Sequence, residues 1–223
     1  MSKDQRGDEV ELLKGKYQSV YFESSKQLLE GLNSVSPSFC LAKWYSVSLH
    51  LPTGRTHSCY HPPSHHIPLE ELAASPDALH NTQHKKEQRT KMLKGERPKE
   101  CEFCWALEDQ GNMSDRAYRS KDVYEPDLIE AAQIEENPKP RYLEVNFNQA
   151  CNLKCAYCSP HLSTEWHKEV KQHGSYKLTD RSHNDPSWMV DEGWLPYNSL
   201  DNPYLLAFWD WFPTVYSELQ TFR

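Results

Sequence analysis

The sequence contains no long run of hydrophobic residues. Hydrophobic residues make up only 37% of the 223 residues, and no apolar stretch approaches the roughly 20 residues that a membrane-spanning helix requires. The segment after Met1 is charged and carries no apolar core of the signal-peptide kind. We therefore expect no signal peptide, no transmembrane helix and no membrane partner.

Positive charge is also scarce. The chain has 25 Lys and Arg against 32 Asp and Glu, which gives a net charge of -7. Phosphate backbones are bound by basic surfaces, so this balance argues against general binding of nucleic acid. A local run of basic residues, Lys85, Lys86, Arg89 and Lys91, is expected to be a solvated helix face.

The mean hydropathy of -0.84 is low for a compact protein, but 12% of the residues are aromatic. Because aromatic side chains bury large areas, we expect folded structure with long polar loops. Seven cysteines without a secretion signal indicate metal ligands or free thiols in a reducing compartment, and hence a cytoplasmic protein.

A β-hairpin is predicted in the first third of the chain. Residues Val47–Leu51 alternate between apolar and polar, Pro52–Arg55 has turn composition, and Thr56–Tyr60 can form the second strand. Cys40 lies just before this hairpin and Cys59 near its end.

The remaining elements follow from periodicity and capping residues. Further strands are expected at residues 143–147 and 219–223, and a stiff linker at 137–140. A capping Ser75 followed by Pro76 predicts a helix start. Helices are expected over residues 20–32, 69–74, 75–94, 163–173 and 204–219. The middle of the 75–94 helix is expected to face solvent. The stretch 115–134 is expected to be helical in part.

Two further groups receive structural interpretations. The histidines His61, His65 and His66 lie among prolines and are expected to be solvated. The aromatic residues Trp209, Trp211 and Phe212 are expected to pack in the core.

The strongest chemical signal is Cys151-x3-Cys155-x2-Cys158, directly after a predicted strand. Three thiolates from one short loop suit a soft metal centre. Structural zinc takes four ligands, whereas three thiolates on a four-iron cluster leave one iron open. The alternative is zinc, with His161 or His167 as the fourth ligand.

The order of strand, cysteine loop with an aromatic before its third cysteine, and helix resembles the radical S-adenosylmethionine (SAM) superfamily. The resemblance implies that Cys151, Cys155 and Cys158 hold a [4Fe–4S] cluster whose open iron binds SAM, and that Tyr157 lies near the adenine.

A second resemblance lies upstream. Cys40-x13-Gly54-x4-Cys59, followed by Cys101-x2-Cys104 in the run LKGERPKECEFCW, is similar to the SPASM auxiliary-cluster domain and its shortened form, the twitch domain. The resemblance implies that Cys40, Cys59, Cys101 and Cys104 hold one auxiliary Fe–S cluster. Four thiolates including a Cys-x2-Cys pair also describe a structural zinc site.

The resemblances imply an α/β chain in three parts. Residues 1–36 would be an N-terminal extension, residues 37–136 an α+β twitch-like region, and residues 141–223 the start of a partial β/α barrel. The twitch-like cysteines here precede the barrel rather than follow it. The family's Gly-Gly-Glu-Pro segment is absent and only 65 residues follow Cys158, so we expect the N-terminal part of a longer enzyme.

The function implied by the resemblance is reductive cleavage of SAM to a 5′-deoxyadenosyl radical, with an electron donor such as a flavodoxin or ferredoxin as partner. The substrate would be a peptide, protein or small molecule. The alternative from another class is a non-catalytic zinc-binding interaction protein.

Overall fold

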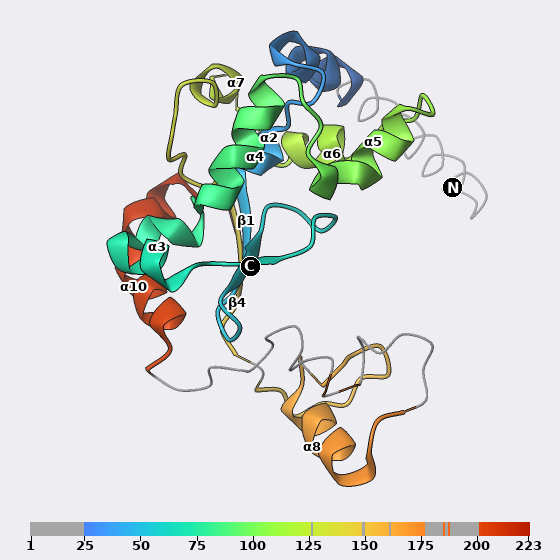
Figure 1. Cartoon of the computed structure of the whole chain (residues 1–223), viewed down its shortest axis with the longest axis vertical. Coiled ribbons are helices and arrows are strands. Elements are labelled where there is room, and N and C mark those ends of the chain that lie inside the picture. Colours follow the sequence, from blue (N-terminus) through green and yellow to red (C-terminus); the bar gives the residue numbers. More distant parts are fainter. Residues whose placement is uncertain are drawn as a thin grey trace, which may run out of the picture. The chain divides into compact units, whose positions relative to one another are not determined.

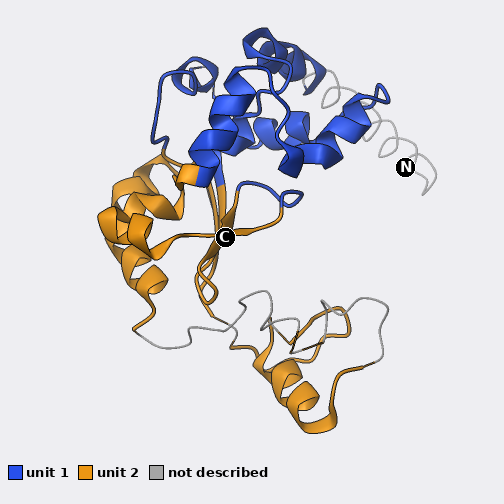
Figure 2. Cartoon of the chain, viewed as in Figure 1, with its two compact units in different colours: residues 1–46, 58–62, 84–138 blue, residues 47–57, 63–83, 139–223 orange. Residues whose placement is uncertain are grey.

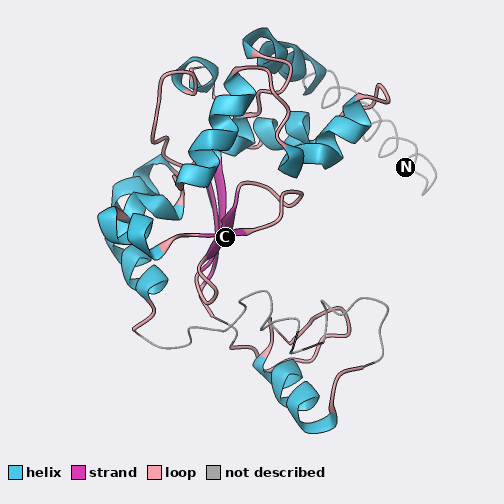
Figure 3. Ribbon diagram, in the orientation of Figure 1, coloured by secondary structure: helices cyan, strands magenta, loops and turns pink. Residues whose placement is uncertain are grey.

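The computed structural model describes residues 25–125, 127–148, 150–160, 162–176, 185, 187 and 201–223. They form helices and one mixed sheet (Figures 1 and 3), which confirms the α/β class. None of the helices in these ranges is long and apolar enough to cross a membrane.

The chain divides into two compact units (Figure 2). Unit 1 contains the described residues of Met1–Ser46, Ser58–Pro62 and His84–Pro138, and unit 2 those of Val47–His57, Pro63–Gln83 and Lys139–Arg223. The predicted division of the sequence into an N-terminal extension (1–36), a twitch-like region (37–136) and the start of a barrel (141–223) stays a prediction.

Unit 1 is helical (Figure 3). Every residue of the short helix α2 is buried, and this helix packs against α6. Phe39 and Trp44 pack in the core of unit 1 with their ring centroids 4.8 Å apart and their planes tilted by 52°. The helices are residues 25–35, α2 (Leu41–Tyr45), α4 (Gln83–Leu93, from its second residue on), the 3-10 turn η2 (Lys99–Cys101), α5 (Glu102–Glu108), α6 (Asp115–Lys121) and α7 (Leu128–Ala131).

The predicted continuous helix from residue 75 to residue 94 is wrong. A 3-10 turn, η1 (Pro76–Leu79), ends before three buried residues at 80–82, and α4 begins afterwards. The prediction of a solvated basic face on α4 is also wrong for two members, because Lys85 is 1% and Arg89 3% exposed. The Arg89 Nε donates to the Lys43 carbonyl at 3.0 Å. Tertiary contacts therefore bury charged side chains that polarity alone assigns to the surface.

Unit 2 contains a five-stranded sheet of order β3-β2-β1-β4-β5. The predicted hairpin is confirmed, with Ser48 of β1 opposite His57 of β2, but its second strand ends at His57 and does not continue to Tyr60. The β2–β3 pair is antiparallel and the β4–β5 pair is parallel. The strands are β1 (Ser46–His50), β2 (Arg55–His57), β3 (His65–His66), β4 (Tyr142–Asn146) and β5 (Thr221–Phe222).

The core of unit 2 lies against one face of this sheet. Val47 and Leu49 of β1 and Leu143 of β4 point to that face, as the period of two along a strand requires. They cluster with residues of α3 (Leu69–Ala74), η1 and α10 (Pro203–Val215). The predicted helix at 69–74 is thereby confirmed.

The aromatic residues of α10 divide between the core and the surface. Trp211 is 1% exposed and donates from Nε1 to the Asp77 carboxylate at 3.1 Å, while Phe212 packs against the core. The prediction that Trp209 lies in the core is wrong, since it is 56% exposed and stacks on Phe147. Two residues span about 200° of a helix, so Trp209 and Trp211 occupy opposite faces.

The hairpin turn explains why a glycine stands at position 54. Gly54 has φ +61°, a conformation that L residues with a side chain disfavour. A Cβ there would also overlap the ring of Tyr204. The Tyr204 hydroxyl donates to the Ile67 carbonyl at 3.0 Å, and the Ile67 N–H donates to the Gly54 carbonyl at 2.8 Å.

The segment after the cysteine loop also matches the prediction where it is described. Ser163 caps α8 (Thr164–His173), and Gly174 ends it with φ +84°. The predicted irregular stretch at 175–202 lies mostly outside the described residues. Pro213 lies inside α10, and the final strand β5 is confirmed after the short turn η4 (Tyr216–Glu218).

Candidate metal centres

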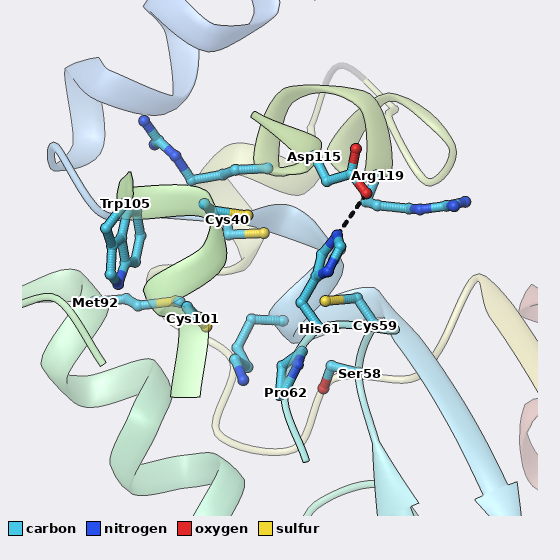
Figure 4. Close-up of a pocket in the computed structure, with 14 residues that line it drawn as sticks. Cys40, Ser58, Cys59, His61, Pro62, Met92, Cys101, Trp105, Asp115 and Arg119 are labelled. Atoms are coloured by element: carbon cyan, nitrogen blue, oxygen red, sulfur yellow. Dashed lines mark hydrogen bonds and ion pairs between the residues drawn. The ribbon is translucent and has the colours of Figure 1, made fainter. Parts of the chain in front are cut away.

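Four cysteines from three separate stretches of unit 1 line one pocket (Figure 4). Cys40 precedes α2, Cys59 follows β2, and Cys101 and Cys104 flank the start of α5. The space inside the pocket, including its open mouth, is about 420 Å³. The structure thus brings together the four cysteines that the twitch-like pattern grouped.

Within the described ranges, no group of three or more His, Cys, Asp or Glu side chains has the arrangement of a metal site. The four sulfurs therefore line a common space without converging on one point. The donor set itself fits a soft metal or an Fe–S cluster, because four thiols and few competing oxygen ligands surround it.

The Cys-x2-Cys pair is positioned by a rigid turn. The passage from η2 into α5 places Cys101 and Cys104 three residues apart, hence on the same side of the helix. The indole Nε1 of Trp105, which is 6% exposed, donates to the Pro98 carbonyl at 2.9 Å and holds the start of this turn.

Helix α6 supplies polar groups to two of the sulfurs. Cys104 is hydrogen-bonded by the Arg116 backbone and the Ser114 side chain. The Cys40 Sγ lies 3.7 Å from the Ser120 Oγ, which also accepts from the Leu41 N–H at 3.0 Å. Hydrogen bonds of this kind are among the determinants of Fe–S reduction potentials.

The guanidinium of Arg116 anchors this helix in the unit. It is 3% exposed and donates to both oxygens of Glu108 at 2.9 Å. It also donates to the Phe39 carbonyl and to the Asn33 side chain, both at 2.9 Å. These four hydrogen bonds from the guanidinium fix α6, and with it the groups that face the sulfurs.

A buried ion pair adjoins the pocket. Lys43, which lines the pocket and is 4% exposed, donates to Glu100, and the second oxygen of Glu100 lies 2.7 Å from the His84 Nε2. Burial opposes ionisation of both partners. For Lys43 the nearby Cys101 and Glu100 outweigh burial and raise the pKa. For Glu100 the His84 hydrogen bond and the Lys43 charge lower the pKa to about 2.

The thiols themselves are hard to ionise. Burial, with smaller contributions from neighbouring cysteines, raises the pKa of Cys59 and of Cys101 to about 12, and that of Cys104 to about 11. The charge of Lys43 acts in the opposite direction on Cys59 and Cys101. Four thiolates in so dry a space require cations among them, which is what a thiophilic centre provides.

Sequence reasoning missed the polar residues of this pocket. The prediction that His61 is solvated is wrong: its Nε2 lies 2.7 Å from the Asp115 carboxylate (Figure 4), and its ring stacks on Phe103 at 3.7 Å. Lys43 is three residues after Cys40 and Glu100 directly precedes Cys101. This closeness to the cysteines in sequence is the signal that could have identified Lys43 and Glu100 as neighbours of the site.

The three-cysteine loop in unit 2 is tied to the first turn of α8. The Thr164 Oγ1 lies 2.9 Å from the Cys151 carbonyl, and the Ser163 Oγ donates to the Leu153 carbonyl at 2.7 Å. The Trp166 indole donates to the Cys155 carbonyl at 2.9 Å. Three carbonyl groups of the loop are therefore held by side chains from the cap and first turn of the helix that follows.

The cysteines of this loop are partly exposed, and the ring beside them is open to solvent. Cys151, Cys155 and Cys158 all have intermediate exposure, and the Cys158 N–H donates to the Cys155 carbonyl at 2.9 Å. Tyr157 is 90% exposed, and its hydrogen bond with Cys155 raises its pKa. A ring with that exposure is available to a planar ligand.

The predicted zinc alternative requires a fourth ligand for this loop. His161 lies outside the described residues. His167 is on α8, and the described ranges contain no three-ligand group that includes it.

Comparison with family models, with curated proteins and with solved structures finds no match to this chain.

Proposed function

We propose that this chain carries the first β/α unit of a radical SAM enzyme, together with an auxiliary Fe–S site in unit 1. The observation that supports this most is the place of the three-cysteine loop, which lies between β4 and α8 and is followed by β5 parallel to β4. A parallel strand pair needs a crossover connection, usually helical. Strand, cysteine loop, helix and parallel strand is the order expected of the first unit of the family's barrel.

In this proposal Cys151, Cys155 and Cys158 hold a [4Fe–4S] cluster. When bound, the cluster would supply the electron that cleaves SAM to methionine and a 5′-deoxyadenosyl radical. The chain's own residues would position it: Ser163, Thr164 and Trp166 hold the loop backbone, and the exposed Tyr157 ring offers a surface to the adenine.

The upstream pocket would hold the auxiliary cluster on Cys40, Cys59, Cys101 and Cys104. Its largely buried cysteines and its hydrogen bonds to sulfur suit an electron-transfer or substrate-binding centre. The competing function is a structural zinc site in the same pocket, which the four-thiol donor set also favours.

Anaerobic reconstitution with iron and sulfide tests the proposal. Two four-iron clusters predict about eight irons per chain and a brown protein. Substituting Cys151, Cys155 and Cys158 with Ser should remove about half of the iron, and the same change at the four upstream cysteines the other half. Two tightly held zinc ions in a colourless protein would overturn the proposal in favour of the zinc-binding alternative.

The open iron site is tested separately by adding SAM to the dithionite-reduced protein. The EPR signal should change in the chain that keeps Cys151, Cys155 and Cys158, and stay unchanged in the Cys→Ser variant of those three. We further propose a flavodoxin- or ferredoxin-type electron donor and a peptide, protein or small-molecule substrate, on the resemblance alone.

A further inference from the structure

One of the cations that line the pocket of unit 1 is almost completely buried. Lys43 is 4% exposed and lines the pocket together with the four cysteines. It follows Cys40, the N-cap of α2, by three residues, so both lie at the start of this helix. Its charge acts on Cys59 and Cys101, which come from different stretches of chain.

The counter-charge lies behind this cation. Glu100 accepts from Lys43 and does not belong to the pocket lining, although it directly precedes Cys101. Its second oxygen is engaged by His84 at 2.7 Å. Glu100 lies outside the pocket lining, yet its charge acts on the neighbouring Cys101 thiol in the direction opposite to that of Lys43.

The two charges of this ion pair affect the electron affinity of a metal centre held by the four cysteines. Adding one electron to a centre held by thiolates increases its negative charge. A nearby cation stabilises the reduced state and an anion destabilises it, and water screens both only weakly here, because the side chains of Lys43 and Glu100 are 5% and 14% exposed. The two charges of one ion pair should consequently act on the reduction potential with opposite signs.

We infer that Lys43 and Glu100 set the reduction potential of the auxiliary centre, Lys43 raising it and Glu100 lowering it. This inference rests on the proposed function, since it requires an Fe–S cluster in the pocket. Lys43 and Glu100 are tuning residues that act through the centre, and neither needs to touch the substrate.

The test uses the full chain with Cys151, Cys155 and Cys158 changed to Ser, so that only the auxiliary centre contributes. Redox titration with dithionite, followed by EPR and visible absorption, gives its midpoint potential. Lys43→Met should lower the potential and Glu100→Gln should raise it. The double variant should return close to the parent, and Lys43→Arg, which keeps the charge, should shift it least.

Iron and sulfide contents measured on each sample separate the outcomes. Zinc without iron in the parent overturns the proposed function, and this inference with it. An intact cluster whose potential moves in the same direction in both single variants, or in neither, overturns the inference alone. If Lys43→Met assembles no cluster, the comparison of Glu100→Gln with the double variant still isolates the Lys43 charge. Equal potentials in those two would refute its role.

Discussion

Replacing Gly54 with Ala should destabilise unit 2 through two separate effects. A left-handed backbone costs a residue with a side chain about 1–2 kcal/mol. Overlap of the new methyl group with the Tyr204 ring adds about 1–3 kcal/mol, as overpacking does elsewhere. The smaller entropy of the unfolded alanine chain offsets about 0.4–1 kcal/mol. The expected loss in free energy of unfolding is therefore about 1–5 kcal/mol.

Gly111 provides a matched control for the backbone part of this loss. It has φ +77°, and no atom lies within 4 Å of where its Cβ would stand. Urea unfolding followed by tryptophan fluorescence and circular dichroism should show a smaller loss for Gly111→Ala, about 1 kcal/mol. Adding Tyr204→Leu to Gly54→Ala should give less than the sum of the two single losses. If Gly54→Ala proves no worse than Gly111→Ala, the close approach of the Tyr204 ring is not the reason for the glycine.

Three further predictions concern single side chains. Trp211→Ala, which removes a buried ring, should lower the free energy of unfolding by about 3–5 kcal/mol. Trp209→Ala, at an exposed position, should lower it by less than about 1 kcal/mol. Equal losses for the two variants in urea titrations would contradict the packing described. The folded-state pKa of Glu100 lies below its usual 4.5, so its ionised form stabilises the fold above about pH 5, and this contribution is lost as the pH falls toward 2. In the metal-free chain, the stability difference between the parent and Glu100→Gln should shrink by about 3 kcal/mol over that window; a difference that grows on acidification would argue against the depressed pKa. Ser163→Ala should remove about 1 kcal/mol of helix capping and speed amide exchange in the first turn of α8, and unchanged exchange at the Trp166 N–H would exclude the capping role.

Local signals predicted the elements of this chain well where they are described. A capping serine and a terminal glycine mark both ends of α8, and turn chemistry with alternating residues marks the hairpin. These features depend on neighbours within a few residues, and the sequence displays them directly. Grouping Cys40, Cys59, Cys101 and Cys104 depended instead on a known spacing pattern, and they do line one pocket.

Features created by tertiary contacts were not predictable from these signals. Lys85 and Arg89 belong to a polar helix whose composition indicates solvent exposure, yet both are buried by other helices of unit 1. The break at residues 80–82 likewise depends on burial. The engagement of His61 depends on Asp115, which is 54 residues away. Sequence periodicity carries no information about partners at that separation.

The interleaving of the two units has a consequence for how the chain folds during synthesis. The polypeptide passes from one unit to the other after residues 46, 57, 62, 83 and 138. Strand β1 therefore leaves the ribosome roughly ninety residues before β4, beside which it is hydrogen-bonded. Pairing across so long an interval is slow, and the hairpin exposes an unpaired edge until then. Neither unit corresponds to one continuous stretch, so cutting the chain at a single linker would not yield a unit that folds by itself.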